Sequence, residues 1–339
     1  MYFSENQAKN CFFTPPNKQL NPIPVVISKT RFQIPLRPMF AVTILGNNSA
    51  LPVYGRHPTA QVLTINDQLL LIDCGEGTQM QLSRYKVRIS KLNYIFISHL
   101  HGDHYFGLIG LLTSMGLLSR KNDITIFCPP GLPEIIQIQL NAADIQLPYS
   151  INYIIMEQGG ILLESRHFTL RCFPVEHRIA CWGCRIDENK LPRRVNKAQA
   201  VEQGIPAAFF PQLQRGEDYT LPSGSVVRNE SVTTSSGKPA SYAYCADTRY
   251  LPELANLVQG VRLLYHEATY LHEVAEKAYT RFHSTAEQAG MIATAAGVER
   301  LLIGHFSSKY EQIEPLLQEA SKVFSSTELA VEGVTFLIR

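Results

Sequence analysis

The sequence predicts an α/β protein, because short apolar runs rich in β-branched residues alternate with stretches of helical periodicity. Histidines and carboxylates directly follow several of these apolar runs, as ligands do at the carboxyl edge of an α/β sheet. Strands are expected at residues 41–45, 69–73, 94–98, 125–127, 170–176, 242–247, 261–267, 300–305 and 334–338. Helices are expected at residues 78–85, 105–118, 132–145, 286–296 and 311–324.

The composition is that of a globular protein. Of the 339 residues, 45% are hydrophobic and 18% are charged, which allows a sizeable core and differs from a disordered or fibrous chain. The formal net charge of +2 is unevenly distributed. Residues 1–39 hold five basic residues against one acid, and residues 178–228 hold eight against five. Such local charge fits either solvated loops or contact with a polyanion.

The distribution of proline, glycine and apolar residues divides the chain. Residues 1–39 form a basic, Pro-rich lead-in. Residues 40–339 carry the alternating strands and helices and are expected to form the main domain, although the length alone permits one domain or two. Within it, residues from about 190 to 237 are rich in Gly, Pro, Ser and charge, and are predicted to leave the core.

The seven cysteines are odd in number, widely spread and mostly set in apolar runs, so we expect reduced core thiols. Cys181 and Cys184 form a CxxC without a second pair, which favours a strand over a zinc knuckle. The N-terminus lacks a signal pattern, and no apolar run approaches the roughly 18 residues of a membrane span. A soluble, cytoplasmic protein without a membrane partner is expected.

Metal-type ligands follow five of the predicted strands. They include the run HLHGDH at residues 99–104, and then His177, Asp247, the pair His266 and Glu267, and His305. Because the carboxyl ends of strands in α/β layers border a ligand crevice, we expect these side chains to meet at one edge. Asp73, which also ends a strand, is expected to hold a ligand imidazole rather than a metal.

The spacing HxHxDH suits two metals. In an extended segment alternate side chains point the same way, so His99 and His101 can share one ion. Asp103 and His104 follow the glycine at Gly102, enter a helix and turn toward a second ion. Nitrogen and carboxylate donors suit zinc, or manganese where oxygen ligands dominate. The alternative, a polar surface turn, fits poorly with three histidines and an aspartate within six residues.

Further motifs extend a resemblance along most of the chain. They are DCGEGTQ at residues 73–79, PVEHR at 174–178, CADTRY at 245–250, HEAT at 266–269, HST at 283–285 and HFSSKY at 305–310. Together with HLHGDH they resemble the ribonuclease Z family of the metallo-β-lactamase superfamily, over residues 41 to about 310. HLHGDH alone is typical of the superfamily, whereas HEAT and HST are typical of the branch that processes tRNA 3′ ends.

The resemblance implies a four-layer αββα metallo-β-lactamase sandwich with a protruding tRNA-binding arm, two Zn²⁺ per chain with Mn²⁺ as an alternative, and a homodimer. It implies an endoribonuclease that removes the 3′ trailer from precursor tRNA, leaving a 3′-hydroxyl on the tRNA and a 5′-phosphate on the trailer. The implied ligands are His99, His101 and His177 for one ion, Asp103, His104 and His305 for the other, and Asp247 as a bridge. Asp103 is also the expected proton acceptor.

His283 is the expected general acid, with Glu267 orienting its ring. Residues 284–287 read as a capping box, so His283 should precede a helix N-terminus, where Ser284 and Thr285 would contact a substrate phosphate. Residues 308–311 read as a second capping box that brings Ser308 to the substrate. The alternative for His283 is a capped surface histidine.

The sequence departs from the family pattern in two places. Residues 45–50 read LGNNSA where the family commonly has LGTGSA. Residues 192–206 resemble the family's tRNA-gripping arm, but Ala207 and Ala208 replace the usual Gly-Pro after it. In this arm we expect Arg193, Arg194 and Lys197, together with Lys190, to contact tRNA phosphates.

Two other functions remain open at this point. A superfamily hydrolase that acts on another ester or phosphodiester would share HLHGDH, but it would not be expected to combine HEAT, HST and a basic excursion. A non-catalytic, zinc-stabilised RNA-binding protein would need a missing ligand or acid, and none is missing from the sequence.

Overall fold

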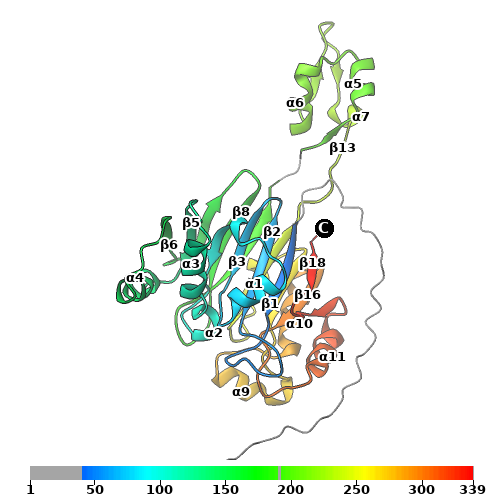
Figure 1. Cartoon of the computed structure of the whole chain (residues 1–339). Coiled ribbons are helices and arrows are strands. Elements are labelled where there is room, and N and C mark those ends of the chain that lie inside the picture. The colour runs from blue at the N-terminus through cyan, green and yellow to red at the C-terminus, as the bar shows by residue number, and fades with distance from the viewer. Residues whose placement is uncertain (1–39, 190–191, 339) are drawn as a thin grey trace, which may run out of the picture. The chain divides into compact units, whose positions relative to one another are not determined.

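The computed structural model describes residues 40–189 and 192–338, so the predicted lead-in of residues 1–39 and Lys190 lie outside it. In the described residues the larger strands form two seven-stranded sheets (Figure 1). The first sheet runs in the order β18 (Thr335–Leu337), β1 (Phe40–Gly46), β2 (Ala60–Ile65), β3 (Gln68–Ile72), β4 (Leu92–Phe96), β5 (Ile124–Cys128) and β6 (Ile151–Ile155).

The second sheet carries most of the later strands. Its order is β17 (Thr327–Leu329), β16 (Arg300–Gly304), β15 (Leu263–Glu267), β14 (Ser241–Cys245), β9 (Cys181–Glu188), β8 (Phe168–Val175) and β7 (Gly160–Glu164). Strand β8 is antiparallel to β9, and β9 is antiparallel to β14. Strands β14, β15 and β16 are parallel to one another. Hence β8, β14, β15 and β16 all end at the same edge, which is where the predicted ligands follow them.

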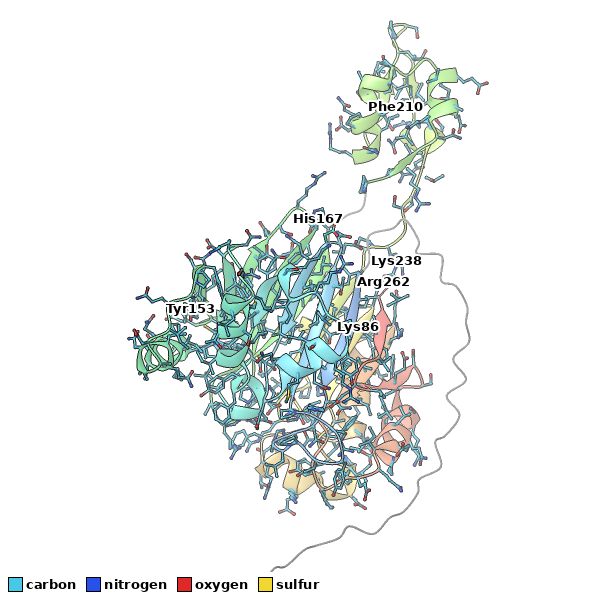
Figure 2. All side chains as sticks on the ribbon, viewed as in Figure 1. Lys86, Tyr153, His167, Phe210, Lys238 and Arg262 are labelled. Atoms are coloured by element: carbon cyan, nitrogen blue, oxygen red, sulfur yellow. The ribbon has the colours of Figure 1, made fainter. Side chains whose placement is uncertain are left out.

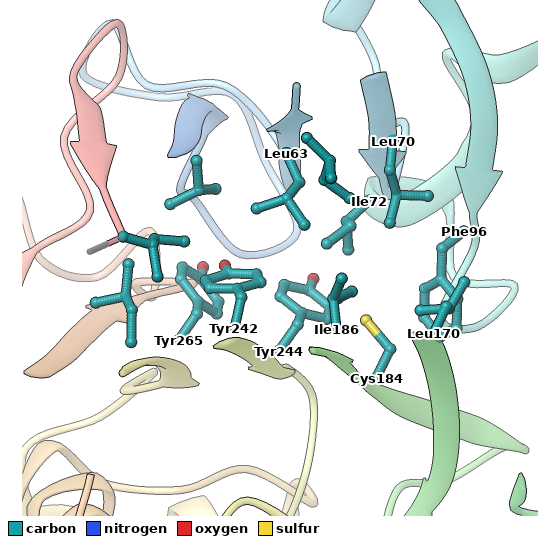
Figure 3. Packing of buried hydrophobic residues seen from close by; sticks show 14 of the residues in the cluster. Leu63, Leu70, Ile72, Phe96, Leu170, Cys184, Ile186, Tyr242, Tyr244 and Tyr265 are labelled. Atoms are coloured by element: carbon teal, nitrogen blue, oxygen red, sulfur yellow. The ribbon is translucent and has the colours of Figure 1, made fainter. Parts of the chain in front are cut away.

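One apolar core lies between the two sheets. Successive side chains on a strand point to opposite faces, so alternate residues such as Leu70 and Ile72 of β3 face inward. Figure 3 shows these side chains opposite Tyr242, Tyr244 and Tyr265 of the second sheet. All five are fully or almost fully buried. The inner layers of the molecule are therefore the two sheets packed face to face.

Helices cover the outer face of each sheet. On the first sheet they are α1 (Thr78–Arg84), η1 (Ile89–Lys91), α2 (Gly102–Tyr105), α3 (Leu108–Leu117) and α4 (Leu132–Ala142). On the second sheet they are α8 (Leu254–Leu257), α10 (Ala286–Ala296) and α11 (Glu314–Val323). The short helix η3 (His272–Val274) packs against α10, and α9 (Ala275–Thr280) packs against η3. The four-layer αββα prediction is confirmed.

Three predicted helices have clearly different bounds, namely those expected at residues 105–118 and 132–145 and the one that corresponds to α11. Residues 105–118 are not one helix, because the chain turns at Gly107 between α2 and α3. The Gly107 N–H donates to Cys74 O at 2.9 Å, and a Cβ at Gly107 would lie 2.2 Å from Gly75 O, so only glycine permits this approach. The helix predicted at 132–145 ends at Ala142, because Asp144 adopts a left-handed φ of 51° that closes the helix.

The second predicted capping box is wrong. Residues 308–311 form a turn and a bend, and α11 begins at Glu314 without a side-chain cap. Pro315 explains the shift, since proline fits the first turn of a helix but lacks the N–H that an interior position needs. A helix that began near residue 309 would place Pro315 in its interior. Ser308 therefore does not begin a helix, and the reason for predicting a phosphate contact there no longer holds.

Residues 192–237, called the arm below, contain their own small elements. These are β10 (Arg194–Val195), α5 (Lys197–Glu202), η2 (Ala207–Phe209), α6 (Phe210–Arg215), β11 (Tyr219–Thr220), β12 (Val226–Val227), α7 (Asn229–Val232) and β13 (Thr233–Thr234). Leu213, Val227 and Val232 form a separate buried cluster against which Phe210 packs (Figure 2). The predicted excursion thus has a core of its own, and Ala207 and Ala208 lie in η2.

Within the described residues, all six cysteines are buried free thiols, and Cys181 and Cys184 lie on β9 as expected. Cys11 lies outside the described residues. None of the helices described combines the length and the apolar character that a bilayer crossing requires.

Candidate metal centre and acid pair

The run HLHGDH follows β4 and delivers four side chains to one place. His101 has extended backbone angles and is the residue before α2, which begins at Gly102. His99 and His101 therefore point the same way, while Asp103 and His104 turn with the first residues of the helix. This is the local path that the spacing predicted.

The first ligand group contains His99, His101, His177 and Asp247, whose donor atoms lie within 4.8 Å of one another. His101 Nδ1 is 2.9 Å from His99 Nε2 and 3.1 Å from His177 Nε2. Asp247 Oδ2 is 3.5 Å from His99 Nε2 and 3.7 Å from His177 Nε2. Three ring nitrogens and one carboxylate oxygen therefore converge.

The second ligand group contains Asp103, His104 and His305. Asp103 Oδ2 is 3.6 Å from the Nε2 atoms of both His104 and His305. Asp247 Oδ1 is 2.9 Å from His305 Nε2 and 3.3 Å from His104 Nε2. The two oxygens of Asp247 thus face one group each, which is the arrangement of a bridging carboxylate.

The outer ring nitrogens have partners that leave the inner nitrogens directed at the centre. His177 Nδ1 lies 3.0 Å from Phe282 O, His104 Nδ1 lies 2.8 Å from Asp73 Oδ2, and His305 Nδ1 lies 3.0 Å from Thr269 Oγ1. Such outer partners fix the tautomer and the orientation of metal-binding imidazoles. Asp247 Oδ1 is buried and, although two ring nitrogens lie within 3.3 Å, it has no hydrogen bond of favourable angle in the described residues. These residues fit a pair of divalent cations with nitrogen and oxygen ligands.

The two ligand groups differ electrostatically. Burial lowers the pKa of His99 well below its usual value, and it also lowers the pKa of His101 and His177. In the second group, burial would lower the pKa of His104 and His305, but Asp247 and Asp103 raise the pKa of His104 well above its usual value and that of His305 to about 10. The second group therefore favours a positive charge at its centre.

Asp73 holds the second group from behind, as predicted. Its Oδ2 lies 2.8 Å from His104 Nδ1 and also accepts from the hydroxyl of Tyr244 at 2.6 Å. Ser98 donates its N–H to Asp73 Oδ1 at 2.7 Å and its hydroxyl to Oδ2 at 2.9 Å. Asp73 is fully buried, so these donors replace the water that its carboxylate would otherwise need.

Several site residues have unusual backbone conformations. Asp73, Asp247 and His305 follow their strands with φ of 57°, 56° and 57°. Non-glycine residues rarely adopt this left-handed region, although Asp and His tolerate it better than most. Conformations of this kind persist where the surroundings determine them, as they do at functional sites.

His283 and Glu267 form the predicted pair. The Nδ1 of His283 lies 3.0 Å from Oε1 of Glu267, which also accepts from the Thr248 N–H at 2.7 Å. The hydroxyl of Thr269 donates to Glu267 Oε2 at 2.5 Å. Burial would lower the pKa of His283, but the carboxylate of Glu267 raises it. Glu267 thus favours the protonated form of His283, which is the form that an acid requires.

The first capping box exists, but its predicted residues were displaced by one. Helix α10 begins at Ala286, and Thr285 caps it with Gln288, rather than Ser284 with Glu287. The hydroxyl of Ser284 donates to Thr248 O at 2.8 Å, and that of Thr285 accepts from the Gln288 N–H at 3.3 Å. Both side chains are fully buried. Their hydroxyls serve the fold, which argues against the predicted phosphate contacts.

Two groups near the site had no role in the sequence prediction. The N–H of Ala50 donates to Asp103 Oδ2 at 2.8 Å from a left-handed residue with φ of 62°. Arg249, two residues after Asp247, stacks on the ring of Tyr279 in α9 and on that of Phe282 in the turn before His283. The position of Arg249 within CADTRY was a usable signal, whereas no sequence signal points to a backbone N–H.

The basic residues of the arm differ in whether their side chains are free to meet a ligand or already bond to neighbours within the arm. Arg194 and Lys197 are exposed. Arg193 is half-buried and donates Nε–H to Thr233 Oγ1 at 2.7 Å. Arg215 and Arg228 form ion pairs with Glu217 and Asp218.

The sequence is similar to a family profile and to several bacterial enzymes. A family profile described as anti-Pycsar protein Apyc1 matches residues 40–143. The ribonuclease Z of Phocaeicola vulgatus is 42% identical over 88% of this chain and 97% of its own length. That of Cytophaga hutchinsonii is 43% identical over 88% of this chain and 96% of its own length.

Solved structures agree on the fold. The short form of human tRNase Z superposes with a TM-score of 0.65 at 24% identity, covering 88% of this chain and 99% of that one. A metallo-β-lactamase fold protein from Bacillus subtilis has a TM-score of 0.63 at 20% identity, covering 89% and 100%. The fold is thus that of the metallo-β-lactamases, and the identity to the bacterial enzymes over nearly the whole chain shows that the protein belongs to the ribonuclease Z family.

Proposed function

We propose that this protein removes the 3′ trailer from precursor tRNA as a metal-dependent endoribonuclease, leaving a 3′-hydroxyl on the tRNA and a 5′-phosphate on the trailer. The observation that carries this proposal is the convergence of two ligand groups on Asp247, with the His283–Glu267 pair beside them. The ring of His283 lies 5.3 Å from that of His177 and 5.5 Å from that of His305, measured between centroids. An acid at this distance can act on a phosphate held by both groups.

The metal content that we propose is two Zn²⁺ per chain, with Mn²⁺ as an alternative. His99, His101 and His177 would hold one ion, Asp103, His104 and His305 the other, and Asp247 would contact both. Two such cations supply a nucleophile from water at neutral pH and neutralise the charge that builds on the phosphate. The neutral imidazoles of the first group and the ionised carboxylates of Asp103 and Asp247 are in the protonation states that metal binding needs. The raised pKa values of His104 and His305 mean that these two rings would release protons when the second ion binds.

The proposed acid is His283. Its Nε2 would give a proton to the departing 3′ oxygen of the tRNA, while its Nδ1–H remains hydrogen-bonded to the carboxylate of Glu267. Asp103 is the proposed proton acceptor on the other side of the reaction. Burial would raise the pKa of Asp103, but His104 and His305 hold it below its usual value, so its carboxylate stays ionised.

For the substrate we propose that Arg194 and Lys197 of the arm meet tRNA phosphates, with Arg193 contributing through the part of its guanidinium that Thr233 does not occupy. A homodimer and a cytoplasmic location also remain proposals. Exposed Met80 on α1, Phe106 between α2 and α3, and Leu117 on α3 are consistent with an interface.

One experiment tests the central proposal. Zinc-loaded protein is incubated with labelled precursor tRNA, and the ends of both products are mapped. We expect a single cut after the tRNA body, a 3′-hydroxyl on that body and a 5′-phosphate on the trailer. A 2′,3′-cyclic phosphate, or an intact precursor at full metal occupancy, would contradict it.

The same experiment addresses the two alternatives. A hydrolase for another ester would leave the precursor intact but turn over a small phosphodiester. A non-catalytic RNA-binding protein would retain tRNA without cutting it. The profile match at residues 40–143 does not favour the first alternative, because it covers HLHGDH but neither HEAT nor HST.

A further inference from the structure

Arg249 connects three segments that carry site residues. Its backbone N–H donates to Glu176 O at 3.0 Å, and its Nη1 donates to Glu176 Oε1 at 2.8 Å, directly before the ligand His177. Its Nε–H donates to Tyr279 O at 2.7 Å. Arg249 itself follows Asp247 by two residues. One side chain therefore joins the end of β8, the end of β14 and the turn that precedes α10.

The guanidinium group also lies over two aromatic rings. Its central carbon is 3.6 Å from the centroid of Phe282 and 4.0 Å from that of Tyr279. Arginine is suited to this place, because a planar cation can stack on aromatic faces and donate in its own plane at once. The side chain of Arg249 is only 16% exposed, although its partner Glu176 is 46% exposed. An ion pair with a partner this exposed to solvent contributes little to the stability of the fold. Arg249 therefore matters for how it positions the segments that it contacts.

Phe282 links Arg249 to His177 and His283. Its carbonyl oxygen lies 3.0 Å from Nδ1 of His177, which leaves His177 Nε2 for the ligand group. Its φ of 61° is left-handed, which is a strained conformation for an aromatic residue. His283 is the next residue, and its N–H donates to Ala278 O at 2.9 Å. The conformation of Phe282 therefore sets both the tautomer of His177 and the place of His283.

We propose that Arg249 is a positioning residue for proton donation to the leaving group: it holds the end of α9 and the turn that follows it (residues 279–283), and thereby places His283 against Glu267 and beside His177. This inference rests on the proposed function, in which His283 is the acid. Arg249 touches neither the ligand groups nor Glu267 directly, so it acts through Phe282 and Tyr279.

The test compares Arg249→Met, Arg249→Lys and a matched control, Arg262→Met. Arg262 has a side chain that is 15% exposed, donates to the backbone carbonyls of Pro239 and Lys238, and pairs with Glu299. It precedes β15, at the end of the strand opposite to the site, and is labelled in Figure 2. Each variant is assayed with precursor tRNA and with an activated aryl phosphodiester, whose leaving group needs no proton, and its zinc content is measured.

A displacement of about 1 Å at a reacting group can cost 10²-fold in rate. We therefore expect Arg249→Met to lower kcat on precursor tRNA roughly 10- to 100-fold, to lower the rate on the aryl diester far less, and to retain its zinc. Arg249→Lys should not restore the rate, because an ammonium group cannot stack and donate in two directions. Arg262→Met should behave as the unchanged protein on both substrates.

Equal decreases on both substrates, loss of zinc, or full activity of Arg249→Met would each overturn the inference. If Arg249→Met does not fold, Tyr279→Leu removes one stacking ring from the surface and should show the same substrate dependence to a smaller degree. His283→Ala is measured in parallel. If it shows no dependence on the leaving group, the proposed acid is wrong; if it does while Arg249→Met does not, only the positioning role fails.

Discussion

In the metal centre His99, His104 and His305 are fully buried and each has a specific partner, whereas Arg194 and Lys197 of the arm are exposed. A buried polar group must be satisfied by the protein, so its position is determined to within a hydrogen bond. An exposed cation is satisfied by water and is free to meet a phosphate in several orientations. The centre should therefore respond to single changes by large factors, and the arm only by small, salt-dependent ones.

The largest effect should follow from removing a ligand. We expect His99→Ala to lose bound metal and activity together, because the first group would keep only two imidazoles and the bridging carboxylate. Metal analysis should find about two ions per chain in the unchanged protein. His167→Ala, an exposed histidine between β7 and β8, is the control and should keep both. A fully active, metal-free protein would remove the basis for the whole assignment.

Removing the acid should cost less and should leave the metals bound. His283→Ala is expected to lower the rate on precursor tRNA by roughly 10² to 10⁴, the usual contribution of a general acid. The effect should shrink on an activated aryl phosphodiester. If both substrates slow by the same factor at full zinc occupancy, His283 is not the proton donor.

Changing a residue that contacts a ligand, rather than the ligand itself, should have a smaller effect on metal binding and activity. Asp73→Asn keeps the shape of the side chain but removes the charge that faces His104. Outer partners of this kind are worth roughly 10- to 100-fold in metal affinity. Zinc titration against a competing chelator should show one weakened site and one unchanged site. Equal weakening of both would mean that Asp73 supports the fold rather than the second group.

The acid pair also predicts a pH effect. Glu267 raises the pKa of His283, and an acid works only while it is protonated, so activity should fall as pH rises through that raised pKa. Glu267→Gln removes the carboxylate, so the descending limb of the rate profile should move to lower pH. Glu287→Gln, which removes a carboxylate 3.7 Å from the half-exposed ring of His272, is the control. If the descending limb of Glu267→Gln does not move, the group that titrates there is not His283.

The contrast between centre and arm also explains what the sequence could predict. Spacing predicted which side chains of HLHGDH go to each ligand group, because a strand end and one helical turn leave little freedom to them. The assignment of His177, Asp247 and His305 to these groups came from the family resemblance. The fold class followed from alternating strands and helices. Helix starts were less secure: Pro315 displaced one, and at α10 two overlapping capping boxes competed, of which the box of Thr285 and Gln288 formed.

Contacts between distant segments could not be predicted. Arg249 reaches Tyr279 and Phe282, some thirty residues later in the chain, and this depends on where the fold places the end of α9 relative to the segment after β14. The Ala50 N–H reaches Asp103 only because the turn after β1 lies beside α2. In the arm, counting charges by segment overstated the basic surface, since Arg215 and Arg228 are paired with acids.

The smallest expected effect belongs to the arm, and it separates binding from chemistry. Backbone contacts raise affinity by releasing counterions, so Arg194→Ala with Lys197→Ala should weaken precursor tRNA binding and reduce its salt slope by roughly 0.7 to 0.9 log units for each phosphate that is no longer neutralised. Arg215→Ala with Arg228→Ala is the matched control, because these cations are already paired within the arm. Affinity is measured at several salt concentrations beside the rate on a small aryl diester, which should not change in either double variant. Equal slopes for both pairs would mean that ion pairing within the arm does not decide which cations meet tRNA, and an unchanged slope for both would return these charges to the role of solvated surface residues.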